Sequence, residues 1–286
     1  MSKNNKTDEL IITELPRAQK AYDNKEFVHS DQGRIIRLIA EYTEPDFHFE
    51  KYHIDKYILF FGSARIISRA KFNDNLSFLE SKLQISNDEQ KENIQNEIKK
   101  LKNLEETTQY YDDAFELSKM LSDWSLKLPP SKRYAICSGG GPGIMEAANK
   151  GAFVSGNKSV GLNISLPFEQ NPNPYINPEL NFEFHYFFMR KFWFSNFAKA
   201  IIIFPGGFGT MDEMWEILTL IQTHKIKLEI PIVIYGSKFW KKLINFEYMV
   251  EMGLIHKNDL DLFKFIDTTN EAYDYIVNEL TRIYKL

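Results

Sequence analysis

Three short apolar runs in this chain of 286 residues each end in a loop of very small residues. Runs and loops together read KYILFFGSAR at 56–65, AICSGGGPG at 135–143 and AIIIFPGGFGT at 200–210. The second and third loops lead directly into segments with helical periodicity. Strands that are apolar on both faces and alternate with helices are typical of a parallel sheet covered on both sides. The pattern therefore predicts an α/β fold with a doubly wound parallel sheet.

The remaining segments suggest how the chain is organised around this sheet. Residues 1–51 are expected to form a polar tail, to about residue 15, and then a helical extension, whereas residues 52–286 form one doubly wound domain. Residues from about 74 to 127 have almost no glycine or proline and are rich in Glu, Lys, Gln and Leu. They predict a helical insertion, an antiparallel pair broken near 85–88, with its charges on a solvated face. Further strands are expected in SVGLNISL, IPIVIYG and LFKFID, with a loop in QNPNPYINPEL.

Composition excludes several classes of protein. The formal charge is −4 with both signs mixed, which does not favour nucleic-acid binding. Cys137 is the single cysteine, so no internal disulfide can form. The most apolar region, 182–204, is interrupted by three cations and is a poor membrane span, and the first residues lack the apolar core of a signal peptide. The histidines show no metal-ligand spacing. We expect a cytoplasmic protein with no metal, no cofactor, and no membrane or nucleic-acid partner.

The glycine loops have a physical use at the carboxyl ends of parallel strands, where ligands bind in such sheets. A helix N-terminus presents unpaired N–H groups and a partial positive charge, and glycine lets the backbone approach a ligand closely. Together they predict a phosphate-binding site. The expected binding residues are Ser63, Gly139, Gly140, Gly141, Gly206, Gly207, Gly209 and Thr210, with Thr210 at the N-cap of its helix.

The two best-known phosphate motifs do not fit these loops. In the dinucleotide fingerprint G-x-G-x-x-G, Ile144 and Asp212 stand where the third glycine belongs. The P-loop G-x-x-x-x-G-K-[ST] has no match. A P-loop NTPase or an NAD enzyme is therefore not favoured.

Charged residues near the loops allow two interpretations. Thr210 to Glu213 fits a capping box, S/T-x-x-E, which would make the glutamate purely structural. A capping box does not need the three preceding glycines, which favours a functional interpretation. Arg190 and Lys191 open a helix, at the end of the dipole that disfavours cations, and a nearby anion would explain that placement.

The segments SGGGPGIMEAANKGA and PGGFGTMDE, with the upstream RK, resemble the LOG family, once labelled "possible lysine decarboxylase". FGSAR, LPFEQNPNPYI and YFFMRKFWF are similar to its longer bacterial members. The resemblance covers roughly 57–236. It implies a Rossmann-like fold, commonly a dimer, and hydrolysis of nucleoside 5′-monophosphates to a free base and ribose 5-phosphate. It also implies catalytic roles for Arg190 and Glu213.

These indications lead to one hypothesis and one main alternative. The hypothesis is hydrolysis of a nucleotide such as AMP, with Glu213 as the first candidate for the catalytic carboxylate, Asp212 as the second, and Arg190 and Lys191 near the substrate anion. The alternative is a nucleotide sensor or carrier without catalysis. A third reading makes the capped helix purely structural. Decarboxylation with pyridoxal phosphate is not favoured, because nothing marks a lysine for the Schiff base.

Overall fold

The computed structural model of the protein describes residues 17–167 and 171–286, so the expected tail lies outside the described residues. The chain divides into two compact units, residues 1–42 and 43–286. The described part of the first unit contains a 3₁₀ turn, Ala21–Asp23, the short helix α1, Lys25–His29, and the beginning of α2, Arg34–Lys51. α2 continues past the division between the units, and the domain boundary expected after residue 51 stays a prediction.

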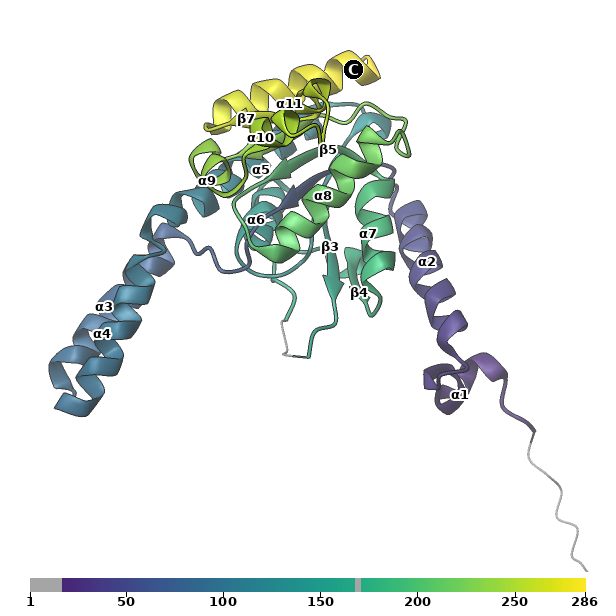
Figure 1. Ribbon diagram of the computed structural model, residues 1–286. Helices are drawn as coiled ribbons and strands as arrows, with labels where there is room; N and C mark the ends of the chain where they lie inside the picture. Colours follow the sequence, from purple (N-terminus) through teal and green to yellow (C-terminus); the bar gives the residue numbers. More distant parts are fainter. Residues whose placement is uncertain (1–16, 168–170) are drawn as a thin grey trace, which may run out of the picture. The chain divides into compact units, whose positions relative to one another are not determined.

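The second unit is built on a parallel sheet whose strands run in the order β4-β3-β2-β1-β5-β6-β7 (Figure 1). The strands are β1 Tyr57–Phe61, β2 Ala135–Ser138, β3 Ser159–Ile164, β4 Asn181–Phe184, β5 Ala198–Ile203, β6 Ile232–Tyr235 and β7 Lys264–Ile266. The predicted α/β doubly wound class is confirmed. Sequence analysis did not predict the edge strand β4, although its burial alternates in the manner of a strand covered on one face.

The order of the strands determines where a ligand can bind. From β1 the chain builds outward through β2, β3 and β4, then returns to the other side of β1 as β5. β1 and β5 pair in parallel up to Phe61 and Ile203, so their carboxyl ends are adjacent. This is the switch point of the sheet, and the predicted glycine loops leave the strands here and at the end of β2.

Helices cover both faces of the sheet (Figure 1). They are α3 Arg69–Ile85, α4 Asp88–Lys102, α5 Thr108–Lys127, α6 Ile144–Ser155, α7 Phe187–Asn196, α8 Phe208–Gln222, α9 Ser237–Leu243, α10 Phe246–Glu251 and α11 Thr269–Tyr284. Further 3₁₀ segments are Glu105–Thr107, Pro130–Lys132, Pro178–Leu180 and Lys257–Leu262. Among the described residues, no helix is at once long and apolar enough to cross a membrane.

The segment predicted as a helical insertion has two parts. α3 and α4 lie side by side, and the break occurs where expected, with Asn87 capping α4 by accepting the Gln90 N–H at 3.0 Å. α5 belongs to the layer that covers the sheet. It packs on α6, where the Ser118 hydroxyl donates to the Ala148 carbonyl at 2.6 Å. Only α3 and α4 are therefore additional to the doubly wound layers.

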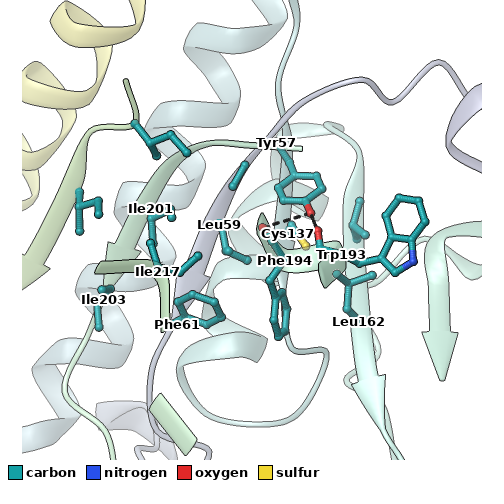
Figure 2. Close-up of a cluster of buried hydrophobic side chains, with 14 of the residues drawn as sticks. Tyr57, Leu59, Phe61, Cys137, Leu162, Trp193, Phe194, Ile201, Ile203 and Ile217 are labelled. Carbon is teal, nitrogen blue, oxygen red and sulfur yellow. Dashed lines mark hydrogen bonds between the residues drawn. The ribbon is translucent and has the colours of Figure 1, made fainter. Parts of the chain in front are cut away.

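One face of the sheet carries an aromatic core that anchors α7 (Figure 2). Tyr57 at the start of β1 is fully buried, and its hydroxyl donates to the Trp193 carbonyl and, at 3.4 Å, to the Phe194 carbonyl. These bonds attach the end of α7 to the central strand. Cys137 is buried in the same core, and burial raises the pKa of its thiol, so it is a packing residue without nucleophilic character.

Candidate functional site

A cavity of about 640 Å³ opens at the carboxyl ends of β1, β2 and β5, where the three glycine loops meet. Of the residues proposed from the sequence, eight line it: Ser63, Gly139, Gly141, Arg190, Gly207, Gly209, Thr210 and Glu213. The other four, Gly140, Lys191, Gly206 and Asp212, are not in its lining. The fold thus brings together residues separated by up to 150 positions in the sequence.

Ser63 ties the three loops to one another. Its backbone N–H donates to the Pro205 carbonyl at 3.0 Å, and its own carbonyl accepts the Ile144 N–H at 3.1 Å. Its hydroxyl oxygen accepts the Arg65 N–H at 3.1 Å. The loop after β1 is therefore bonded to the loop after β5 and to the first residue of α6. These contacts fix the backbone around the cavity before any ligand binds.

The loop 205–210 uses its glycines in two ways. At Gly206 an added Cβ would lie 2.1 Å from the Thr210 hydroxyl oxygen, so this position must be glycine for the loop to close on α8. At Gly207 and Gly209 an added Cβ would meet nothing within 4 Å. These two glycines therefore keep space open at the start of α8, where they line the cavity.

The predicted capping box is wrong. α8 begins at Phe208 with Gly207 at the N-cap, and no side chain caps it. Thr210 is therefore inside the first turn and Glu213 lies one turn further along than the box requires. This shift releases the glutamate from any role in capping.

Glu213 instead forms a buried ion pair with Arg190 of α7. The guanidinium Nη2 lies 3.2 Å from Oε1, and the two side chains are only 12% and 7% exposed. Burial raises the pKa of Glu213 to about 7, although the charge of Arg190 opposes the shift. Arg190 lies over the rings of Phe187 and Phe194 at 5.3 and 5.2 Å. Its Nε is buried with no hydrogen-bond partner among the described residues.

Lys191, the neighbour of Arg190, makes a different set of contacts. Its ammonium lies 2.8 Å from Asp212 and 2.7 Å from Glu216, both on α8. The Asp212 side chain is 58% exposed. The anion expected near the start of α7 is thus supplied, at least for Lys191, by carboxylates of the protein. Asp212 and Lys191 stay predictions as site residues, and the geometry places their pair beside the cavity.

The loop 138–143 leaves β2 with a sharply constrained backbone. Gly140 has a φ of +74° and Gly143 a φ of +73°, values that favour glycine. An added Cβ at Gly140 would lie 2.1 Å from the Asn163 carboxamide oxygen. The Gly140 N–H donates to the Ser138 hydroxyl at 3.0 Å. Gly140 therefore determines the backbone conformation of the loop without lining the cavity, whereas Gly139 and Gly141 line it.

Sequence analysis missed most of the apolar wall. Met145, Ile164, Leu166, Phe187 and Phe194 line the cavity with the polar Asn163. A helical aromatic stripe in the sequence does not reveal which ring reaches a cavity, and here Phe194 does. Phe208 also lines the cavity and is 90% exposed. Within the described ranges, no group of three metal-ligating side chains was found.

The chain is similar to several known proteins. A family model described as "Possible lysine decarboxylase" matches residues 145–276, a range that includes Arg190 and Glu213. Pyrimidine/purine nucleotide 5′-monophosphate nucleosidases of three Escherichia coli strains are 32% identical over 117 residues. That match covers 36% of this chain and 24% of each relative, so this chain spans about a quarter of their length. The solved structure of TM1055, a structural genomics target, has a TM-score of 0.45 at 16% identity, covering 78% of this chain and 99% of that one.

Proposed function

We propose that this chain is a member of the LOG family and that it hydrolyses the N-glycosidic bond of a nucleoside 5′-monophosphate, releasing a free base and ribose 5-phosphate. The observation that carries the proposal is the buried Arg190–Glu213 pair in a cavity bounded by two glycine loops. The names of the curated relatives support the same class of substrate. We further propose a homodimeric, cytoplasmic protein that needs no cofactor, which light scattering and fractionation would test.

The phosphate of the substrate would bind at the start of α8. Gly207, Gly209 and Thr210 line the cavity there, and the N-terminus of this 15-residue helix carries unpaired N–H groups and a partial positive charge. The open space at both glycines leaves room for an anion to approach the backbone. Gly206 supports the site indirectly, by letting Thr210 close on the loop.

Glu213 would assist the bond cleavage. Breaking the bond between C1′ and the base nitrogen builds positive charge on the ribose, as in glycoside hydrolysis. A carboxylate beside the ring stabilises that charge or positions the attacking water. Arg190 would hold the Glu213 carboxylate in place and favour its ionised form, because the cation offsets part of the cost of burial.

The apolar wall is suited to the base. Met145, Phe187 and Phe194 line the cavity with the exposed ring of Phe208. Aromatic and sulfur-containing side chains pack well on the faces of a flat heterocycle. No lysine is among the described residues that line the cavity, which gives no support to the Schiff base that a decarboxylase using pyridoxal phosphate requires.

The test is release of free base from a panel of nucleoside 5′-monophosphates that begins with AMP, followed by chromatography. Wild type is compared with Glu213→Gln and Arg190→Ala. We expect release by the wild type and strong losses in both variants. If wild type binds AMP in calorimetry but releases no base from any nucleotide, the alternative of a sensor or carrier replaces the enzyme.

A further inference from the structure

The loop rich in proline and asparagine places a buried asparagine against the loop 138–143. Asn173 is 6% exposed. Its backbone N–H donates to the Gly140 carbonyl at 2.8 Å. Its carboxamide Nδ2 donates to the carbonyls of Gly140 and Gly141 at 3.0 and 3.1 Å and to Asn149 Oδ1 at 2.9 Å. One side chain therefore fixes two successive carbonyl groups of a loop that lines the cavity.

The bonds to Gly140 determine where the next N–H points. In a trans peptide the C=O and the following N–H point in opposite directions, and no cis peptide bond occurs among the described residues. Because the Gly140 carbonyl is turned toward Asn173, the Gly141 N–H is turned away from it. Gly141 is buried and lines the cavity, and its N–H has no acceptor among the described residues. Buried residues rarely leave an N–H without an acceptor, and such an N–H at the wall of a cavity is available to donate to a ligand atom.

A buried polar network holds the loop just before this peptide. The Ser138 hydroxyl accepts the Gly140 N–H at 3.0 Å and donates to Asn149 Oδ1 at 2.6 Å. Asn149 in turn donates to the Val160 carbonyl of β3 at 3.1 Å. The network connects the loop to two strands of the sheet and holds the preceding peptide, Gly139–Gly140, so the backbone that leads into the Gly140–Gly141 peptide is fixed as well.

The backbone that carries Asn173 is itself restrained. Pro172 and Pro174 flank it, and a residue before proline is confined to extended conformations. Farther along, an added Cβ at Gly161 of β3 would lie 2.3 Å from Ile176, which shows how closely this segment packs on the sheet. The Asn177 side chain accepts the Ser159 N–H at 2.8 Å. The segment that carries Asn173 is therefore rigid, and it holds the Asn173 side chain in place against the loop 138–143.

We propose that Asn173 is a positioning residue that aims the Gly141 N–H into the cavity as a hydrogen-bond donor to an oxygen of the ribose 5-phosphate group. This inference rests on the proposed function and adds a second loop to the recognition of the substrate. The α8 end of the cavity takes the phosphate, and Gly141 holds the same group from the β2 side. Asn173 itself does not touch the substrate.

The test compares Asn173→Asp with Asn157→Asp. The first variant keeps the shape of the side chain and replaces the Nδ2 donor with an oxygen that repels the Gly140 and Gly141 carbonyls. Asn157 is also buried, at 7% exposure, and its Nδ2 donates to the Tyr134 carbonyl at 3.0 Å, at the amino ends of β2 and β3 and away from the cavity. It therefore controls for the general cost of a buried charge.

Calorimetry with ribose 5-phosphate measures the effect without turnover, because this probe has no glycosidic bond. We expect Asn173→Asp to raise Kd about 10- to 100-fold with unchanged stoichiometry, since a hydrogen bond to a charged group is lost. Asn157→Asp should keep the wild-type Kd. A purely structural defect would instead lower the stoichiometry and leave Kd unchanged, which would overturn the proposal. If Asn173→Asp does not fold, Asn173→Ala, which retains the backbone bond, should raise Kd about 3- to 10-fold.

Base release from AMP by the wild type tests the proposed function separately. An active wild type with an unchanged Kd in Asn173→Asp would overturn the inference alone. A wild type that releases no base, but whose ribose 5-phosphate binding is weakened by Asn173→Asp, would overturn the function and support the inference. A wild type that neither releases base nor binds ribose 5-phosphate would overturn both.

Discussion

Two adjacent cations on α7 form pairs with carboxylates on α8, and the carboxylates Glu213 and Asp212 differ sharply in exposure, at 7% and 58%. The Arg190–Glu213 pair is almost completely buried and lines the cavity, and the guanidinium lies over two aromatic rings. The Lys191–Asp212 pair is one residue away on each helix, and its carboxylate is 58% exposed. Burial removes the Glu213 carboxylate of this inner pair from water and raises its pKa. The Asp212 carboxylate of the outer pair stays solvated.

Arg190 and Lys191 are neighbours in the sequence, yet we expect one to serve catalysis and the other to serve only the packing of α7 on α8. An exposed ion pair typically contributes at most about 1 kcal/mol to stability, whereas breaking a buried pair leaves an uncompensated charge at a much higher cost. If the inner pair is catalytic and the outer pair only joins the two helices, conservative changes in each should have very different consequences. The following predictions test that division.

The largest effect is expected for Glu213→Gln, which keeps the shape of the side chain and removes its charge. Loss of a group that stabilises charge in the transition state typically costs about 100-fold or more in kcat. Steady-state release of base from AMP measures it. The matched control is Asp212→Asn, which should stay within about threefold of wild type. Equal losses in the two variants would break the distinction between inner and outer pair.

A smaller loss is expected for Arg190→Lys. Lysine keeps the positive charge but lacks the planar guanidinium that lies over the rings of Phe187 and Phe194. We expect kcat/KM to fall about 10- to 100-fold, by the typical worth of a charge-assisted hydrogen bond. Lys191→Arg is the reciprocal control and should have little effect. Wild-type activity in Arg190→Lys would show that only the charge matters.

The pH dependence follows from the raised pKa of Glu213. Because the active form is taken to be the carboxylate, activity should be lost as the pH falls through about 7. Between pH 8 and pH 6 the ionised fraction of such a group falls about 10-fold, and kcat/KM should follow. The limb near pH 7 should be absent from Glu213→Gln and present in Asp212→Asn. Activity that rises as the pH falls would instead assign the protonated acid to the chemistry.

Part of this site could be predicted from the sequence because local patterns determine it. Runs of apolar residues followed by glycine predicted the strands and the loops at their carboxyl ends, and the order of the strands then brings those loops together. The same local reasoning was wrong for the capping box. Helix α8 begins at Phe208, two residues before Thr210, and the spacing of residue types does not reveal that shift.

Other features depend on contacts between distant residues, which no local pattern contains. Asn173 reaches the loop 138–143 across more than 30 positions of the chain. The division between Arg190 and Lys191 likewise follows from which side of α7 faces the cavity, and that depends on how Tyr57 anchors the helix. Contacts of both kinds become visible only when the packing of the whole domain is known.

The smallest effect is expected for Lys191→Met, which tests the outer pair alone. The substitution removes the ammonium from Asp212 and Glu216 while keeping an apolar stem against the helix surface. Because Asp212 stays solvated, the free energy of unfolding should fall by at most about 1 kcal/mol, measured by urea denaturation. Base release should stay within about twofold of wild type. A loss as large as that of Arg190→Lys would return Lys191 to the substrate-binding role suggested by the sequence and show that the two pairs act as one unit.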